Sequence, residues 1–576
     1  MNKFDDAMKF LFLFLAIILT SPVLKSQGDE LWVYFGTYTR GKDSEGVYSA
    51  KLNLKTGQLS KPVLAAKGDN PSFLTILPNE RYLIAVEETN DYAGKASGSV
   101  ASYAINSADG SLVLSDRVST QGGAPCHISS DQAGGHVFFA NYVGGSVGGV
   151  SVDDSGKLKM SSFIQHTGSS ILPRQKSPHA HSIDIDPSGK FVVCADLGLD
   201  QVVIYDYESS SGKLRVNDPG FAKVKPGNGP RHFAFSPNGK FGYTNNEITS
   251  SVTAFEFDST KGALKEMQTI STLPESHAKK RNSTAELLMH PSGKFLYCSN
   301  RGHDSIAVFN VSEASGKLEL VEIQVLGVKT PRGFGIDPTG QYLIAGGQNS
   351  NDVRVFKINS ADGAIDPVGP PISVPCPVCV QFLYPKVNGY ESIFDGKSIK
   401  GWEGSEEWFR VESGAIVAGS LEKKIPRNQF LVTNKSYKDF DLKFKAKLIG
   451  EGKNAGVQFW SERIPNHHEM IGFQCDIGIM GKISIWGALY DESRRRKFLT
   501  NVSKPTQKVS KLDGWNEFRI RAQGDIITIW INGALATRYF ENVNETKIPR
   551  NGRFGLQIHS GPPAEAWYKD IQIKEL

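Results

Sequence analysis

Metal-site and redox motifs are scarce in this 576-residue chain, which has only 6 cysteines and 8 tryptophans. It contains no HExxH zinc signature and no Gly-x-Gly-x-x-Gly dinucleotide fingerprint, which argues against those metalloproteases and Rossmann enzymes. The one Cys-x-x-Cys, Cys376 to Cys379, has no second pair and no partner histidines, so it is a weak zinc or redox signal. The other cysteines lie far apart in strand-like segments, and we expect buried free thiols. We expect no metal and no cofactor.

Charge and long apolar runs are also limited. The net charge is +5 and no large basic stripe is present, so nucleic acid is not an expected partner. The basic run Arg494–Lys497 is either a solvated face or a grip on an anionic or hydroxyl-rich ligand. The apolar run 10–20 follows Lys3 and Lys9 and is shorter than the roughly 20 residues that cross a bilayer. It is typical of a signal peptide ending at Ser26, which predicts export to the periplasm or beyond without stable membrane insertion. A retained anchor is the alternative.

Glycine, in contrast, is abundant (58 residues) and recurs in a repeated unit. The unit is an apolar stretch, a turn such as Pro-x-Gly, and a second strand, as in SIDIDPSGKFVVCADL (182–197) and FAFSPNGKFGYTNNE (233–247). Pro187, Pro237, Pro291 and Pro338 are 50, 54 and 47 residues apart, which is the size of a propeller blade. Six complete units leave LWVYFGTYT (31–39) and VCVQFLYP (378–385) to complete a seventh blade from both ends. We therefore predict an all-β chain with a seven-bladed propeller over 31–385.

Several phrases of these repeats resemble the lactonase family of seven-bladed propellers, which includes 6-phosphogluconolactonases. They include HAHSIDIDPSGKF, GPRHFAFSPNGKFGYTNNE and HPSGKFLYCSNRGHDSIAVF, in order along the chain. The resemblance implies a central cleft lined by one histidine, one glutamate and two arginines. By position these predicted catalytic residues are His181, Arg231, Glu247 and Arg301. The flanking His127, His232 and His303 are candidate substrate contacts.

The chemistry of these residue types suits lactone hydrolysis. Arginines bind carboxylate and developing oxyanion through charge-assisted hydrogen bonds. A nearby histidine or glutamate can take a proton from water. The alternative is structural, because polar residues at equivalent blade positions can simply tie neighbouring blades together. Export favours a lactone other than the cytoplasmic phosphorylated one.

The segment from 390 to 576 has a different pattern, with strand-like stretches and turns but no repeat, which predicts an antiparallel β-sandwich or jelly roll. The phrases SIFDGKSIKGW, NAGVQFWSE and GRFGLQIHSGPPAEAWYKDIQIKEL resemble the 3-keto-disaccharide hydrolase domain, a concanavalin-like jelly roll. Many members carry a glutamate where this chain has Gln474, and Asp476 supplies a carboxylate two residues later on the same strand face. The other candidate sugar contacts are Tyr490, Asp491, Arg494 and His559.

The sequence therefore predicts an exported hydrolase of carbohydrate metabolism, acting on a small sugar lactone, a keto-sugar, or both. A glycan is a further expected partner of the second domain. The alternative is a non-catalytic propeller scaffold joined to a carbohydrate-binding sandwich, because the propeller fold alone does not imply catalysis.

Overall fold

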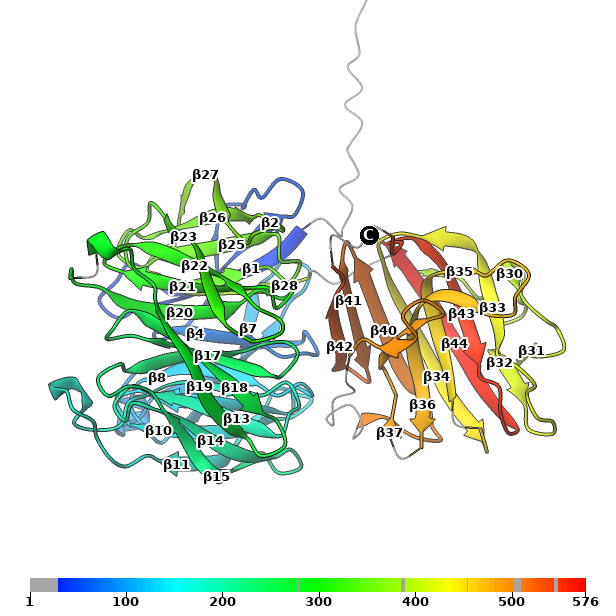
Figure 1. The fold of residues 1–576 in the computed structure, drawn as a ribbon, viewed down its shortest axis with the longest axis horizontal. Helices are drawn as coiled ribbons and strands as arrows, with labels where there is room; N and C mark the ends of the chain where they lie inside the picture. Colours follow the sequence, from blue (N-terminus) through cyan, green and yellow to red (C-terminus); the bar gives the residue numbers. More distant parts are fainter. Residues whose placement is uncertain are drawn as a thin grey trace, which may run out of the picture.

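The computed structural model describes residues 30–277, 279–384, 389–452, 454–481, 483–500, 509–542 and 547–576. The predicted signal peptide lies outside these residues. Figure 1 shows two bodies side by side, a propeller coloured blue to green and a sandwich coloured yellow to red. In the described part of the chain, helix is limited to short 3₁₀ turns, and none is long or apolar enough to cross a membrane. These turns are η1 (Tyr92–Gly94), η2 (Pro173–Gln175) and η3 (Glu275–His277).

The propeller consists of seven four-stranded antiparallel sheets, each ordered from its innermost strand outward. Four blades are β28 (Pro377–Leu383), β1 (Glu30–Thr37), β2 (Gly46–Asn53), β3 (Val63–Lys67); β4 (Phe73–Ile76), β5 (Tyr82–Glu87), β6 (Ser99–Ile105), β7 (Leu112–Ser119); β8 (Pro125–Ser130), β9 (His136–Asn141), β10 (Ser146–Val152), β11 (Leu158–Gln165); and β12 (Ala180–Ile185), β13 (Phe191–Asp196), β14 (Gln201–Glu208), β15 (Lys213–Lys223). The other three are β16 (Pro230–Phe235), β17 (Phe241–Asn246), β18 (Ser251–Asp258), β19 (Ala263–Ser271); β20 (Ser283–Met289), β21 (Phe295–Arg301), β22 (Ser305–Val311), β23 (Leu318–Val325); and β24 (Pro331–Ile336), β25 (Tyr342–Gly347), β26 (Asp352–Ile358), β27 (Ile365–Ser373).

The second strand of each blade is largely buried because neighbouring blades cover both of its faces. β13, with the sequence FVVCAD, is buried at every position. The turn before it is built by Asp186, whose carboxylate accepts the backbone N–H groups of Ser188 and Phe191. The next blade closes tightly on this strand, since a Cβ placed on Gly262 would lie 2.5 Å from the Phe191 ring. The repeated turn glycines thus let blades approach one another.

Both ends of the propeller sequence meet in one blade. β1 pairs antiparallel with β28 in a register that sets Trp32 opposite Leu383 and Tyr34 opposite Gln381. This confirms the predicted pairing of the first and last strands. The hydrogen bonds of this blade thereby tie the two ends of the propeller sequence together and close the ring.

The sandwich has two packed sheets. The first contains β31 (Phe409–Glu412), β32 (Ala415–Ser420), β44 (Ala564–Glu575), β34 (Phe440–Gly450), β40 (Asn516–Gln523), β41 (Ile526–Ile531) and β42 (Ala534–Phe540), with β29 (Glu391–Ser392) beside β44. The second contains β30 (Trp402–Glu403), β33 (Gln429–Tyr437), β43 (Gly552–Ile558), β35 (Asn454–Arg463), β36 (Met470–Met480), β38 (Leu489–Glu492) and β39 (Lys497–Phe498), with β37 (Ile483–Ser484) beside β36. One large apolar cluster fills the space between the sheets.

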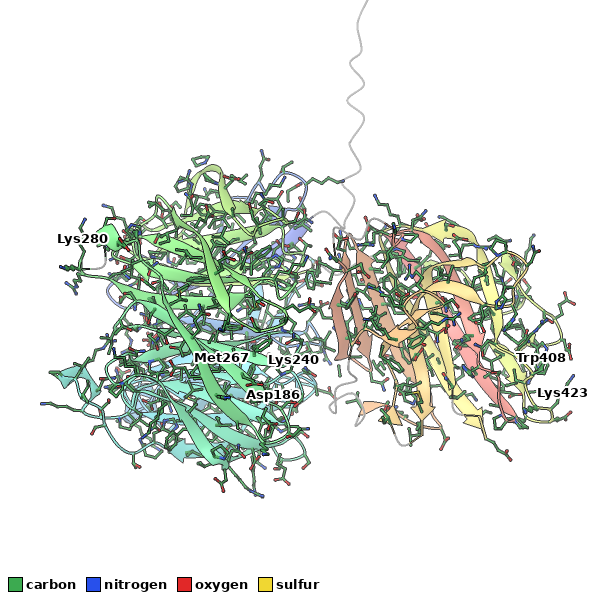
Figure 2. All side chains as sticks on the ribbon, in the orientation of Figure 1. Asp186, Lys240, Met267, Lys280, Trp408 and Lys423 are labelled. Atoms are coloured by element: carbon green, nitrogen blue, oxygen red, sulfur yellow. The ribbon has the colours of Figure 1, made fainter. Side chains whose placement is uncertain are left out.

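The sandwich packs against the propeller through β40 to β42. Arg519 on β40 forms an ion pair with Glu80 in a propeller turn (Nη1 to Oε2, 2.7 Å), and Arg521 stacks on Tyr384 at 3.7 Å from the ring centroid. In Figure 2 Asp186 and Lys240, on equivalent turns of two other blades, lie on the side toward the sandwich, whereas Lys280 lies on the far side. One mouth of the propeller therefore faces the sandwich and the other faces away.

Candidate active site

The innermost strands of five successive blades share a local irregularity at the same place. The pairing register breaks between Pro125 and His127, and again at the corresponding points of β12, β16, β20 and β24. A β-bulge inserts a residue and redirects side chains. The side chains in or beside these bulges surround the central channel, and they are Cys126, His127, His181, Arg231, His232, Glu286 and Arg332.

A second set of polar residues lies where the second strand of a blade ends. Glu247 directly follows β17, Arg301 is the last residue of β21, and Glu88 directly follows β5. The backbone N–H of Glu247 donates to the Gly229 carbonyl, which fixes it against the segment that precedes β16. Equivalent repeat positions thus bring side chains from different blades to the mouth of one channel.

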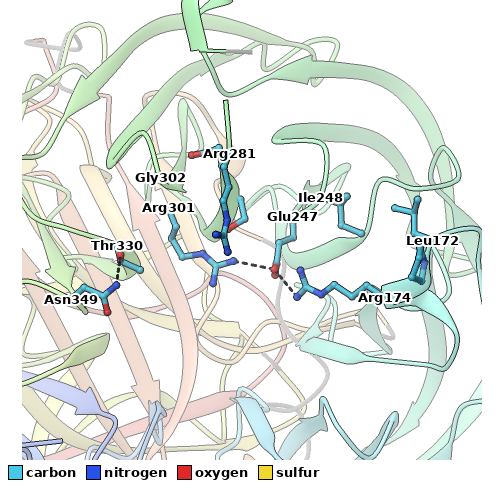
Figure 3. Close-up of a pocket in the computed structure, with 12 residues that line it drawn as sticks. Leu172, Arg174, Glu247, Ile248, Arg281, Arg301, Gly302, Thr330 and Asn349 are labelled. Carbon is cyan, nitrogen blue, oxygen red and sulfur yellow. Dashed lines mark hydrogen bonds and ion pairs between the residues drawn. The ribbon is translucent and has the colours of Figure 1, made fainter. Parts of the chain in front are cut away.

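Glu247 is the centre of a three-arginine cluster, and Figure 3 shows two of these arginines, Arg174 and Arg301, beside it. Its Oε2 lies 2.9 Å from Arg231 Nε, and its Oε1 lies 2.7 Å from Arg174 Nη2 and 3.2 Å from Arg301 Nη2. Burial alone would raise the pKa of Glu247, but Arg301, Arg231 and Arg174 together lower it to about 2. Burial and the neighbouring Arg231 lower the pKa of Arg301 to about 9, so it remains charged at neutral pH. The cluster therefore carries a net positive charge.

A cavity of about 750 Å³ opens at this cluster, on the side of the propeller away from the sandwich. Its lining is rich in hydrogen-bond donors and consists of Leu172, Pro173, Arg174, Glu247, Ile248, Arg281, Asn282, Ser283, Arg301, Gly302, Thr330 and Asn349. Three arginines oppose one carboxylate among these residues, so the cavity suits an oxygen-rich ligand that carries or develops negative charge.

Three histidines lie deeper in the channel. The ring centroids of His127 and His181 are 5.1 and 5.3 Å from that of His232. Burial lowers the pKa of all three well below the usual value of 6.5, and in His181 and His232 the arginine charges lower it further. They are therefore neutral at pH 7.

The structure places His181, Arg231, Glu247 and Arg301 around this one channel, and it places His127 and His232 beside His181. Their catalytic and binding roles stay predictions. His303 lies apart from the three histidines of the channel. Its Nδ1 is 2.8 Å from Ser305 Oγ, its ring packs on His277, and it lines neither the cavity nor the deep channel.

Sequence reasoning missed five charged residues of the channel and cavity. One is Glu88, which directly follows β5 as Glu247 directly follows β17, so alignment of the repeats could have found it. Arg332 in TPRGF has the same repeat position as Arg231 in GPRHF, and Glu286 has the position of His232, so alignment of the repeats could have found both. Arg174 and Arg281 lie in loops between blades, outside the repeat pattern, and no signal pointed to them.

The sandwich carries a second polar cluster, on the outer face of its second sheet. Gln474 Nε2 donates to Asp476 Oδ1 (2.6 Å), and Gln458 Nε2 donates to Gln474 Oε1 (3.1 Å). Burial raises the pKa of Asp476 to about 8. On β43, Gln557 is fully buried, and neither its amide oxygen nor its amide nitrogen has a hydrogen-bond partner in the described structure. An unpartnered buried amide is costly, which suggests a group that accepts a ligand.

The predicted sandwich residues divide between two faces of β36 and β38. Tyr490 is opposite Gln474 in the register, whereas Asp491 is opposite Phe473, a core residue. Asp491 is held by Arg495 and, at 2.7 Å, by Arg494, whose guanidinium stacks on the Phe473 ring. Asp491 and Arg494 thus lie on the face away from Asp476. His559 directly follows β43, and its Nδ1 is 2.8 Å from the Ser560 carbonyl oxygen.

Comparisons with known proteins agree with this architecture. Residues 32–382 match the family model described as lactonase, 7-bladed beta-propeller, and residues 389–574 match that of the 3-keto-alpha-glucoside-1,2-lyase-like domain. A 6-phosphogluconolactonase of Bacillus subtilis is 36% identical over 352 residues, which cover 61% of this chain and 98% of that protein. A 6-phosphogluconolactonase of Formosa agariphila is 32% identical, over 53% of this chain and 86% of its own length.

Among solved structures, the periplasmic gluconolactonase of Pseudomonas aeruginosa is 32% identical with a TM-score of 0.57, and the match covers 62% of this chain and 99% of that one. The family match spans more than half of the chain and coincides with the seven observed blades. The chain therefore belongs to the lactonase family of seven-bladed β-propellers, with a C-terminal 3-keto-alpha-glucoside-1,2-lyase-like domain.

Proposed function

We propose that the propeller hydrolyses a sugar lactone in the cavity beside Glu247. The observation that carries this proposal is the Glu247 cluster, in which three arginines converge on one carboxylate at the edge of a donor-rich cavity. A scaffold has no need to concentrate like charges in this way, because arginines that repel one another destabilise the fold. A lactone substrate accounts for the arginines, because its reaction develops negative charge that they can stabilise.

The geometry supports a simple course for the reaction. Addition of water to the lactone carbonyl places negative charge on its oxygen, and opening of the ring leaves a carboxylate. Arg301 lines the cavity and can donate to those oxygens, each such bond contributing about 1.5–3 kcal/mol, and the buried Arg231 adds positive charge beside it. Glu247 keeps the two guanidinium groups oriented. Because its pKa is about 2, Glu247 is a carboxylate at neutral pH and a weak proton acceptor.

The test is an assay of lactone hydrolysis by the full-length chain. Glucono-δ-lactone, 6-phosphogluconolactone and galactono-lactones are supplied separately, and the uncatalysed rate is subtracted. The proposal expects saturable hydrolysis of at least one of them, reduced about 10²-fold in Arg301→Ala. Rates equal to the uncatalysed reaction for every lactone would favour the scaffold alternative.

We also propose that the protein is exported and acts on a sugar lactone without phosphate. The support is the apolar run 10–20 with its lysines, together with the periplasmic gluconolactonase among the structural relatives. Fractionation of producing cells tests the location, since the proposal expects the chain outside the cytoplasm and shortened at its N-terminus. A full-length cytoplasmic chain would contradict it.

For the sandwich we propose a role on 3-keto-glycosides or related glycans, at the face that carries Gln458, Gln474, Asp476 and Gln557. The unpartnered Gln557 amide favours this second function. Titration calorimetry of the full chain with a 3-keto-glycoside and with its parent glycoside measures binding, and product analysis measures cleavage. Loss of the binding heat in Gln557→Leu supports the site. Unchanged binding in that variant would show that the glycan binds at a different site.

A further inference from the structure

Below the Arg231–Glu247 ion pair lies a second, much smaller cavity. Its volume of about 10 Å³ is close to the minimum that holds one water molecule. Its walls include Glu286, Glu88, Arg231, Arg332 and His232, so a space for one water is enclosed by two carboxylates, two guanidinium groups and an imidazole. A buried polar chamber of this kind favours an ordered water over an empty void.

Glu286 presents one free oxygen to this chamber. It occupies the bulge of β20 and is 3% exposed. Its Oε1 accepts the Leu287 N–H (3.0 Å) and lies 2.6 Å from His232 Nδ1. Its Oε2 has no hydrogen-bond partner among the residues that the structure describes, although the residue lines the chamber. One oxygen is therefore fixed and the other is available to a water.

Arg231 joins the chamber to the cavity above. Its Nε binds Glu247, which lines the large cavity, and its Nη1 donates to the carbonyl of Ala285 (2.6 Å), the residue before Glu286. The guanidinium and Glu286 are thus held in a fixed relation. The chamber that Glu286 lines is thus linked, through Arg231 and Glu247, to the cavity in which we propose that the lactone binds.

We propose that Glu286 is the general base of the lactone hydrolysis, acting on a water held in the chamber, and this rests on the function proposed above. Glu286 takes one proton as the water oxygen bonds to the carbonyl carbon. The ring C–O bond then breaks, and the proton passes from Glu286 to the released ring oxygen. Lactone and water give one hydroxycarboxylic acid, and Glu286 returns to the carboxylate.

The other candidate bases fit this role less well. Glu247 is engaged with three arginines and is too weakly basic, and the histidines are neutral with strongly lowered pKa values. Burial raises the pKa of Glu286 to about 7, against the opposing effects of His127, Arg231 and Arg332, which places it near the pH at which a general base is most effective. The titratable and charged groups that surround it are Glu88, Cys126, His127, Asp184, Arg231, His232, Cys298, Arg332 and Cys379.

The experiment measures kcat and kcat/KM of the full-length chain between pH 5 and 9, with the lactone that the wild type hydrolyses fastest. The variants are Glu286→Gln, Glu286→Asp and, as a matched control, Asp131→Asn, which changes a buried carboxyl in the turn between β8 and β9 of another blade. In the wild type kcat/KM should rise as Glu286 loses its proton near pH 7. Glu286→Gln should lose about 10²- to 10⁴-fold in kcat and lose this rise. Asp131→Asn should keep the wild-type kcat and pH profile.

Each outcome of these kinetic measurements either supports or overturns the role of Glu286. A Glu286→Gln variant that retains the wild-type kcat and pH profile overturns the proposal, and it leaves the lactonase function intact if Arg301→Ala is still impaired. If Glu286→Gln fails to fold, Glu286→Asp decides, because aspartate keeps the carboxylate but holds it farther from the water. A low kcat with the rise of kcat/KM near pH 7 retained supports the proposal, and a wild-type kcat overturns it. Absence of lactone turnover in the wild type refutes the proposed function itself.

Discussion

Replacement of Glu247 by glutamine tests the electrostatics of the arginine cluster. In the folded chain the pKa of Glu247 is lowered from 4.5 to about 2. At about 1.36 kcal/mol per pKa unit this difference corresponds to about 3 kcal/mol of stability at pH 7. Because the folded pKa is the lower one, this stability is present above pH 4.5 and is lost as the pH falls toward 2. Glutamine removes it and leaves Arg231, which is 1% exposed, without its anion.

Differential scanning calorimetry of wild type and Glu247→Gln at several pH values measures the effect. At pH 7 the propeller transition of the variant should fall by about 4 °C, from the unfolding entropy of a domain of this size. The difference between the two proteins should shrink by about 2 kcal/mol when the pH is lowered from 7 to 3. Glu45→Gln is the control, since Glu45 forms an exposed pair with Lys67 and no change is expected. Equal unfolding temperatures of wild type and Glu247→Gln at pH 7, or a difference independent of pH, would refute this reasoning.

Three further predictions concern turnover, the sandwich and the contact between the domains. Arg231→Lys should not restore the turnover lost in Arg231→Ala, because an ammonium cannot bind Glu247 and the Ala285 carbonyl together, and steady-state kinetics of both variants check this. Asp476→Asn should stabilise the chain by about 1.4 kcal/mol for each pH unit between pH 4 and 8, because the raised pKa of Asp476, about 8 in the folded chain, means that its ionisation favours unfolding. An unchanged unfolding temperature of the variant at pH 8 would be inconsistent with a buried Asp476. Glu80→Ala should weaken the ion pair with Arg519 and separate the propeller and sandwich transitions in calorimetry, and a single unaltered transition would show that other contacts hold the domains together.

The fold could be predicted because the same short sequence signals recur in successive blades. The turn aspartates, prolines and glycines fix the blade period, and the β1–β28 closure follows from counting strands. The six cysteines are buried and free, and for Cys126, Cys194 and Cys298 this was expected from their place in strand-like segments. The residues of the channel could be predicted only where they repeat, because a ring brings equivalent positions together.

The remainder of the two sites depends on packing that no repeat encodes. Arg174 reaches Glu247 from η2, in a connection between two blades, and the repeat pattern does not say where such a connection lies. In the sandwich, Asp491 was grouped with Asp476 as a sugar contact, but strand register and the Arg494 ion pair turn it toward the core. Side-chain alternation is visible in the sequence, whereas the partner strand that fixes which face is buried is not.

The most direct test of the proposed catalysis is the rate of lactone hydrolysis by wild type and Arg301→Ala, measured with equal folded protein and the same lactone. Arg301 borders the cavity and is one of the three arginines paired with Glu247, so its loss should remove a donor to the reacting oxygens and only part of the stability that Glu247 contributes. We expect a clear rate above the uncatalysed reaction for the wild type. For Arg301→Ala we expect about a 10²-fold lower kcat/KM, with a smaller fall in unfolding temperature than for Glu247→Gln. Equal kcat/KM in the two proteins would contradict a catalytic role for the arginine cluster.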